Sequence, residues 1–546
     1  MPNELPADLE ACRQLIRELF QTLKQQTHLN EKLQHQLEQL LRRVYGHRSE
    51  KLDPNQLLLF AREILAENQA TPAANAPPAD AASTATEASP PKKNGHGRKQ
   101  LPANLPRKPV LHDVAAEQLP CPECGTVRTR IGEETREQLE YVPASLFVLK
   151  HARTKYACKT CGGHVVVAER LPGPIEKGLP GPGLLAQVIV SKYADHLPLY
   201  RQERIFERQG VELSRQTTCD WMRTCADLLK PIWQAMYRRV LRSRVIQTDD
   251  TPVRVQNPVT KVMTTGRLGD YLGDLDHPFI VYDYTPDRSA LGPERMLADF
   301  RTGYLQSDAY AGYGQIHARG VLEVGCMAHA RRRFDTAKKT DLVRAHEGLA
   351  WIGLLYQVER HAKAQIENQL TELARAGPVD AATKGRIRDE TVSRFRREES
   401  RPLVERFGVW LEKAALEVLP KSPIGEAIAY ARSNWTALTR YLDAGYLSID
   451  NNAAERAMRP IALGRKNWLH IGSDRGGRTA AVLLSVVQSC TALKVEPFAY
   501  LRDVLDRVST HPASRIAELL PDAWKQPEQQ ASTTNRRAKS VRRRRT

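Results

Sequence analysis

The chain has 546 residues, 41% of them hydrophobic, and a formal net charge of +18 at pH 7. This length predicts roughly two to four domains with a sizeable core, and the odd number of nine cysteines favours a reducing compartment. No apolar stretch is long enough to cross a membrane and no signal-peptide pattern is present, so we expect a cytoplasmic, nucleoid-associated protein with no membrane partner. The clustered positive charge indicates a nucleic-acid partner more strongly than a merely soluble basic protein.

Leucine-rich heptads occupy residues 9–44. Leucine fills most positions of one heptad series and Asn30 interrupts the other, which is the pattern of a parallel two-stranded coiled coil. An amphipathic helix packed on its own domain is the alternative, but the length of the repeat favours self-association as a homodimer or higher oligomer. Farther along, residues 70–92 are rich in Ala, Pro, Ser and Thr without aromatics, which predicts a disordered linker with a basic end at 91–102.

Two CxxCG motifs, CPECG at 121–125 and CKTCG at 158–162, predict a zinc ribbon. Each motif turns tightly enough for two thiolates to face one ion, and the alternating segment between the motifs predicts a hairpin that brings them together. Four thiolates leave no open coordination position, so the Zn²⁺ is expected to be structural. Four buried or free thiols are the alternative, and His164 is a less favoured ligand. The expected ligands are Cys121, Cys124, Cys158 and Cys161.

Residues 173–242 are expected to be helical, with one helix that begins near Ser214. The run IFERQGVELSRQTTCDWM combines a short helix, Gly210 and a polar-faced helix, which is similar to a helix-turn-helix. Two ordinary packed helices explain the same run equally well, so the sequence leaves DNA binding by this region open.

From residue 243 the pattern changes to strands. Three β runs come first, a short helix follows, a further strand ends at Asp308, and another strand turns into a basic helix. This is the order of the ribonuclease H fold, so the expected fold class is multidomain α/β with a ribonuclease H-like core. The charged, helical stretch at about 335–445 is too long for a loop and is interpreted as a helical insertion. Residues 446–508 then return to compact structure.

Three candidate catalytic acids stand where a strand ends or a helix begins: Asp249 in QTDDTPVRV, Asp308 in YLQSDAYAGY and Glu455 in DNNAAERAMRP. Mg²⁺ (or Mn²⁺) binds a few carboxylates and keeps several waters. Two such ions about 4 Å apart activate a hydroxyl and stabilise the leaving oxygen in phosphodiester cleavage. The pattern predicts that Asp249 bridges both ions, while Asp308 and Glu455 hold one each.

Alternation along the strand does not separate Asp249 from its neighbour Asp250, because successive side chains simply point to opposite faces. Glu455 is preferred as the third acid because the preceding DNN sequence offers a helix cap and places this glutamate in the first turn. The weaker rivals of Asp308 and Glu455 are Asp283, Asp287, Asp450 and Asp474.

Basic residues follow two of these acids in the sequence. The segment LGRKNWLHIGS at 463–473 offers cations for phosphates and Trp468 for base stacking. His329 is expected to line the DNA path together with the arginines that follow it. The C-terminal stretch 525–546 predicts a disordered basic tail that contacts phosphates without sequence preference. The expected DNA-binding residues are Arg331, Arg332, Arg459, Arg465 and Lys466.

Long strings of the chain resemble the DDE transposases of the insertion-sequence sixty-six family. They include GYLQSDAYAGY, GCMAHARRRF and IDNNAAERAMRPIALGRKNWLHIGSDRGG, besides the leucine-rich start and the CPECG and CKTCG pair. The resemblance covers nearly the whole chain and selects Asp249, Asp308 and Glu455 by motif position. It implies a transposase that cleaves the DNA ends of its insertion element and joins them to target DNA in a metal-dependent reaction, and it suggests accessory proteins of the same element.

The chain departs from the family pattern in three places: Asp250 replaces a usual Glu, Gly269–Asp270 a usual Trp-plus-apolar pair, and Met327 a usual Trp. The second departure is expected to weaken its strand, and none removes a proposed metal ligand. Two alternative functions are a ribonuclease H-like nuclease that does not transpose and a DNA-binding regulator with an inactive core.

These segments give an expected domain organisation. It consists of a coiled-coil region at 1–69, a disordered linker at 70–105, a zinc ribbon at 106–172, a helical region with candidate DNA-binding helices at 173–242, a catalytic domain at 243–508 and a C-terminal segment with a basic tail at 509–546.

Overall fold

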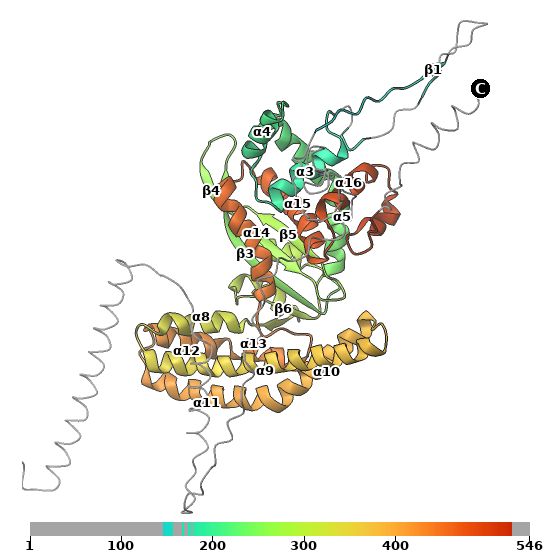
Figure 1. Cartoon of the computed structure of the whole chain (residues 1–546). Coiled ribbons are helices and arrows are strands. Elements are labelled where there is room, and N and C mark those ends of the chain that lie inside the picture. Colours follow the sequence, from blue (N-terminus) through green and yellow to red (C-terminus); the bar gives the residue numbers. More distant parts are fainter. Residues whose placement is uncertain (1–145, 157–165, 169–172, 176–177, 527–546) are drawn as a thin grey trace, which may run out of the picture. The chain divides into compact units, whose positions relative to one another are not determined.

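The computed structural model describes residues 146–156, 166–168, 173–175 and 178–526 (Figure 1). The chain separates into two units, one formed by Met1–Thr71 with Arg153–Thr546 and the other by Pro72–Ala152. The predicted coiled coil, the linker, the four ribbon cysteines and nearly all of the basic tail lie outside the described residues. Among the helices that are described, none is long and apolar enough to span a bilayer.

A five-stranded mixed sheet lies at the centre of the larger unit, with the strand order β5-β4-β3-β6-β7. Strand β4 is antiparallel to β3 and β5, whereas β6 is parallel to β3 and β7. This arrangement confirms the predicted ribonuclease H-like α/β core. The strands are β3 (Val245–Gln256), β4 (Met263–Leu272), β5 (Ile280–Thr285), β6 (Tyr304–Gln306) and β7 (Leu322–Val324), and a separate antiparallel pair joins β1 (Lys155–Tyr156) to β2 (Val166–Val167).

Helices that precede, separate and follow the strands in the chain share one large hydrophobic core with this sheet. They are α3 (Pro182–Tyr193), α4 (Leu199–Arg208), α5 (Arg215–Val240), α6 (Leu291–Met296), α7 (Gly314–Ala318), α14 (Asn452–Trp468), α15 (Asp474–Ala492) and α16 (Pro497–Arg507), with the short 3-10 helices η2 (Ala311–Tyr313) and η5 (Ala513–Leu519). Helix α15 covers the free edge of β5, because the backbone N–H groups of Ile280 and Tyr282 donate to the hydroxyls of Ser489 and Ser485. These bonds satisfy groups that an open strand edge would leave unpaired.

Helices α4 and α5 occupy the run that resembles a helix-turn-helix. Ser214 caps α5 by accepting a hydrogen bond from the backbone N–H of Thr217, so the predicted start of this helix is correct. The buried side of α5 contributes Trp221, Leu229 and Met236 to the sheet core. DNA binding by α4 and α5 stays a prediction.

Between β7 and α14 the chain forms a helical bundle with a core of its own (Figure 1). Its elements are α8 (Met327–Ala337), α9 (Leu342–Ala376), α10 (Ala381–Phe395), the π-helix η3 (Arg396–Ser400), α11 (Arg401–Glu417), α12 (Pro423–Ser433), α13 (Trp435–Thr439) and the 3-10 helix η4 (Arg440–Asp443). The rings of Trp351 and Trp410 both stack on Phe407 at the centre of this core. Val245 and Val324 of the sheet belong to the same core, so the bundle is packed on the β3 and β7 end of the sheet.

Candidate active site

Asp249 and Asp308 lie at matched positions of two parallel strands. Strand β6 pairs with β3 over residues 245–247, and the last pair joins Gln247 to Gln306. Each acid lies two residues beyond this pair. The two glutamine side chains are also hydrogen-bonded, at 2.7 Å between Nε2 and Oε1. Both acids therefore lie just beyond the point where β3 and β6 separate.

The backbone turns sharply directly after Asp308. Ala309 has a φ of 63°, in the left-handed region that residues other than glycine rarely adopt. The Asp308 carboxylate accepts a hydrogen bond from the backbone N–H of Tyr310 at 3.2 Å, which holds the side chain at this turn. A residue kept in such a conformation costs free energy and often marks a functional site.

Asp250 and Asp249 differ in their ion-pair partners. The Asp250 carboxylate lies 2.9 Å from Arg267 and 3.6 Å from Arg288. Asp249 has no ion-pair partner among the residues that the structure describes, and its Oδ1 accepts only the backbone N–H of Asp250 at 2.8 Å. Asp250 is thus neutralised by arginines, whereas Asp249 remains available for a cation.

The pKa of Asp249 reports on its surroundings. Burial is the main cause that raises this pKa to about 7, and the charges of Asp308, Asp250 and Glu455 raise it further, against the lowering effect of the Asp250 N–H. The carboxylates of Asp308 and Glu455 thus act on Asp249 although they come from distant parts of the chain. A partly buried carboxyl beside two others is a favourable place for a divalent cation.

Glu455 lies in the first turn of α14, as predicted. The helix begins at Asn452, whose backbone N–H donates to Asp450 Oδ1 at 3.1 Å. The buried Asn451 donates from Nδ2 to the carbonyl of Thr248 at 2.9 Å. Because Thr248 directly precedes Asp249, this bond fixes the start of α14 against the strand that carries the first acid.

The rest of α14 is held along the same strand (Figure 1). Arg465 donates from Nη1 to Thr251 Oγ1 at 2.9 Å and to the carbonyl of Pro252 at 3.0 Å. Beyond the helix, Ile471 forms a parallel bridge with Val255. These contacts occupy the edge of β3 that β6 leaves free, and they determine which side of the helix faces Asp249.

A buried arginine of the insertion organises the chain that leads to α14. Arg396 in η3 has a side chain that is 2% exposed and pairs with Glu359 at 2.7 Å. The same guanidinium donates to the carbonyls of Tyr441, Ala444 and Leu447. The insertion therefore fixes the segment just before Glu455 and does not merely lengthen the chain.

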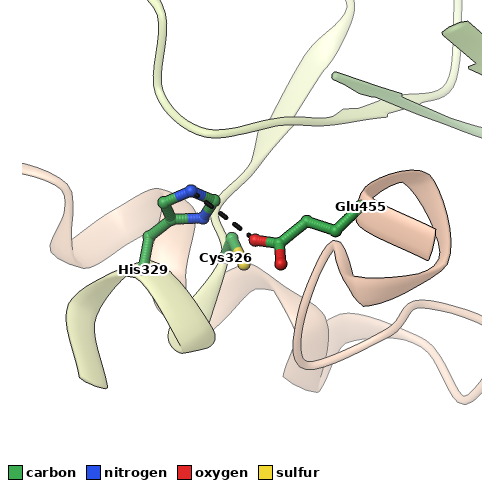
Figure 2. Close-up of side chains that lie close together, drawn as sticks. All are labelled: Cys326, His329 and Glu455. Atoms are coloured by element: carbon green, nitrogen blue, oxygen red, sulfur yellow. Dashed lines mark ion pairs between the residues drawn. The ribbon is translucent and has the colours of Figure 1, made fainter. Parts of the chain in front are cut away.

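Glu455 also meets the N-terminal end of α8 (Figure 2). Arg332 Nη2 lies 3.3 Å from its Oε1, and His329 Nε2 lies 3.7 Å from the same oxygen. Burial and the charge of Arg332 lower the pKa of His329, although the Glu455 charge opposes this shift. Potential ligand atoms of Cys326, His329 and Glu455 all lie within 4.8 Å of one another.

The three predicted acids offer only oxygen ligands, which suits Mg²⁺. They do not belong to one cluster as tight as that of Cys326, His329 and Glu455 in the described part of the chain. Two ions about 4 Å apart, each bound at about 2.0–2.1 Å, are held by carboxylates on opposite sides, so such tight spacing is not required. The donor set fits a pair of hard divalent cations.

Each rival acid has a hydrogen-bond or ion-pair partner in the described part of the chain. These contacts join Asp283 to Arg295, Asp287 to Ser289, Asp450 to Tyr356 and Asp474 to Tyr284.

The residues predicted to bind DNA fall into two groups. Arg459 and Lys466 are exposed on α14, and the half-exposed Arg332 reaches Glu455 from α8. Arg331 is only partly exposed, and Arg465 is engaged with β3 as described above. The basic side chains of α14 that could contact DNA therefore lie on its exposed side, whereas Arg465 on the inner side is bound to β3.

The sequence interpretation missed the role of Asp270. This residue is completely buried, and its Oδ1 accepts a hydrogen bond from the backbone N–H of Asp249 at 2.9 Å. Burial and the charge of Asp249 raise the pKa of Asp270 well above its ordinary value. The signal in the sequence was that Gly269–Asp270 departs from the family pattern. The expected weakening does not interrupt β4, which continues through both residues.

Comparison with known families agrees with this geometry. The "Transposase IS66 family" matches residues 177–479, which contain all three acids. The other matches are "zinc-finger binding domain of transposase IS66" at 119–162, "Transposase C of IS166 homeodomain" at 32–110 and "IS66 C-terminal element" at 485–521. The zinc-finger match contains all four predicted zinc ligands, and the 32–110 match overlaps the end of the predicted coiled coil.

Relatives with curated sequences align along most of the chain. The uncharacterized protein y4hP of Sinorhizobium fredii (strain NBRC 101917 / NGR234) is 32% identical over 517 residues, which are 90% of this chain and 88% of that protein. The uncharacterized protein y4qI of the same strain is 33% identical over 447 residues, 79% of this chain and 78% of its own length. With these relatives and a family match over residues 177–479, which is more than half of the chain, the chain belongs to the IS66 family of transposases.

Proposed function

We propose that this transposase cleaves the DNA ends of its insertion element and joins them to target DNA, with Asp249, Asp308 and Glu455 as the ligands of Mg²⁺ or Mn²⁺. The observation that carries the proposal is the matched position of Asp249 and Asp308 beyond the last pair of β3 and β6, together with the effect of the Glu455 charge on Asp249. Carboxylates gathered in this way are unfavourable unless a cation neutralises them.

The residues divide the work according to their position. Bound divalent cations would activate the attacking hydroxyl and stabilise the leaving oxygen. Asp249, on the central strand, would hold the cations together with Asp308 and Glu455. Arg332 pairs with Glu455 while its side chain is 50% exposed, so it is free to move to a DNA phosphate when the glutamate binds a cation.

Other parts of the chain provide the grip on DNA. The exposed Arg459 and Lys466 lie on the helix that carries Glu455 and face a backbone phosphate there. The zinc-finger region, with structural Zn²⁺, and the basic tail add contacts to element ends and target. The coiled coil pairs protomers, and accessory proteins of the same element assist the reaction.

Strand transfer of labelled end DNA by the full-length protein in Mg²⁺ tests this proposal. Replacing Asp249 or Asp308 by Asn, or Glu455 by Gln, is expected to reduce cleavage and joining by roughly 100-fold or more, because each change removes a ligand worth several kcal/mol. Asp506→Asn, at an exposed acid of α16, is the matched control and should retain the wild-type rate.

Each outcome of this assay has a defined meaning. Unchanged joining by any one of the three variants removes that residue from the site, and loss of activity in Asp250→Asn but not in Asp249→Asn moves the first ligand by one position. Cleavage without joining would indicate a nuclease. A wild-type protein that binds end DNA but never cleaves it would indicate a regulator with an inactive core.

A further inference from the structure

A second set of potential metal ligands lies beside Glu455, on the side of the insertion. Cys326 immediately precedes α8 and His329 lies in its first turn, so the C-x-x-H spacing places a thiol and an imidazole at one end of the helix (Figure 2). Their ligand atoms and those of Glu455 all lie within 4.8 Å of one another. The cleavage reaction proposed above uses neither sulfur nor imidazole.

The side chains in this cluster have free ligand atoms. His329 Nδ1 is buried and has no hydrogen-bond partner in the described part of the chain, which is costly for a polar atom. Its Nε2 lies 3.7 Å from Glu455 Oε1. The Cys326 side chain is completely buried, and its sulfur accepts a hydrogen bond from the backbone N–H of Asn451 at 3.2 Å. That bond attaches the sulfur to the residue before α14, close to Glu455.

The chemistry of these ligands differs from that of the three acids. Thiolate, imidazole and carboxylate together form a ligand set typical of Zn²⁺ and related ions, whereas Mg²⁺ avoids sulfur. In a tetrahedral zinc site the ligand atoms lie roughly 3.5 Å apart. Glu455 has a side chain that is 27% exposed, so a rotation of this side chain closes the remaining gap. Three protein ligands leave a fourth position for water.

We propose that Cys326, His329 and Glu455 bind a thiophilic divalent cation of the Zn²⁺ class, and that this ion inhibits the transposase by withdrawing Glu455 from the Mg²⁺ site. Glu455 belongs to both ligand sets, and its rotation toward Cys326 and His329 would take its carboxylate away from the Mg²⁺ site. The inhibition rests on the proposed function, whereas the binding of the ion does not.

Binding is tested on the full-length protein with its zinc-finger region already loaded with Zn²⁺. Titration with Cd²⁺ is followed by the ultraviolet charge-transfer absorption of thiolate–cadmium bonds. Wild type is expected to show an additional band that Cys326→Ser lacks, while Cys490→Ser, at an equally buried cysteine of α15, keeps it. His329→Gln should weaken this uptake by about tenfold or more. Thermal unfolding of each variant verifies that it is folded.

Inhibition is tested by adding Zn²⁺ to the Mg²⁺-dependent cleavage assay and comparing each variant with its own zinc-free rate. Wild type and Cys490→Ser should be inhibited alike, and Cys326→Ser should need at least about tenfold more Zn²⁺. Identical Cd²⁺ spectra of wild type and Cys326→Ser would overturn the metal site. If Cd²⁺ binding depends on Cys326 but Zn²⁺ inhibits wild type and Cys326→Ser equally, the proposed withdrawal of Glu455 from the Mg²⁺ site is wrong. If wild type never cleaves DNA, the proposed function fails, and the Cd²⁺ spectra alone decide the metal site.

Discussion

Two neighbouring aspartates on adjacent strands show how burial determines the state of a carboxyl group. Asp270 is completely buried, which raises its pKa, and its Oδ1 accepts the backbone N–H of Asp249. Asp249 lies at the edge, within reach of the charges of Asp308 and Glu455. Asp270 thus orients the backbone at the first acid, while Asp249 keeps its oxygens for a cation.

In Mg²⁺-free buffer, Asp249→Asn is expected to be more stable than wild type near pH 8 and to lose this advantage as the pH falls to about 4. The pKa of Asp249 is about 7 in the folded chain and about 3.9 when unfolded. The folded state therefore holds the proton more tightly, and its stability falls as the pH rises from about 4 to about 7. The difference above that range should be on the order of 1–3 kcal/mol. Thermal unfolding at several pH values measures this difference in stability between the variant and wild type. A difference that does not change with pH would contradict the raised pKa.

Asp270→Asn is expected to retain most stability, because the amide oxygen still accepts the N–H of Asp249. Asp270→Leu removes this acceptor and leaves a buried N–H unpaired, which should lower the free energy of unfolding by about 1–3 kcal/mol. Urea unfolding of both variants tests the difference. Equal losses in the two variants would mean that the hydrogen bond to Asp249 is unimportant.

At the level of elements, the site depends on one helix held along one strand. β3 has a free edge beyond Gln247, because β6 ends there. This edge accommodates Pro252, which has no N–H to donate, and it receives Asn451 and Arg465 from α14. The same strand thus carries Asp249 and positions the helix that carries Glu455.

Asn451→Asp is expected to reduce cleavage by roughly tenfold or more and to destabilise the fold by about 1–3 kcal/mol, because it replaces the donor to the Thr248 carbonyl by an acceptor. Asn434→Asp is the matched control: its amide also donates to a carbonyl, that of Tyr430, but far from the acids in sequence. Cleavage rates and urea unfolding are compared for both. A variant at Asn451 that cleaves like wild type would show that this bond does not position Glu455.

At the level of the whole molecule, two hydrophobic cores are joined around the site. The sheet core holds Asp249 and Asp308, and the core of the insertion supports Arg396 and the segment that leads to Glu455. The net charge of +18 surrounds these parts with a field that attracts DNA.

Deletion of residues 527–546 is expected to weaken binding to DNA of any sequence and to make it less sensitive to salt. The deleted segment contains the basic run NRRAKSVRRRRT, and each lost phosphate contact lowers the slope of log K against log salt by about 0.9. Binding measured over a range of salt concentrations gives this slope. An unchanged slope would show that the tail does not touch DNA.

The sequence predicted the order of strands well, because each strand is a short apolar run bounded by turns, and it predicted the first-turn position of Glu455 from the DNN cap. Alternation along the strand could not separate Asp249 from Asp250, and only motif position selected Asp249. The contacts that favour the same choice involve Arg267 and Arg288 from other segments. Asp270 and Cys326 were missed for the same reason. Their importance comes from contacts with Asp249 and Asn451, which only the folded chain brings close.

The central claim is that Asp308 is a metal ligand in the cleavage of element ends. The most direct measurement is cleavage of labelled end DNA by Asp308→Cys in Mg²⁺ and in Mn²⁺. A thiolate binds the softer Mn²⁺ better than Mg²⁺, so the variant should be inactive in Mg²⁺ and regain part of its activity in Mn²⁺, while wild type cleaves with both. Cleavage by Asp308→Cys at the wild-type rate in Mg²⁺ would contradict the metal site at the end of β6.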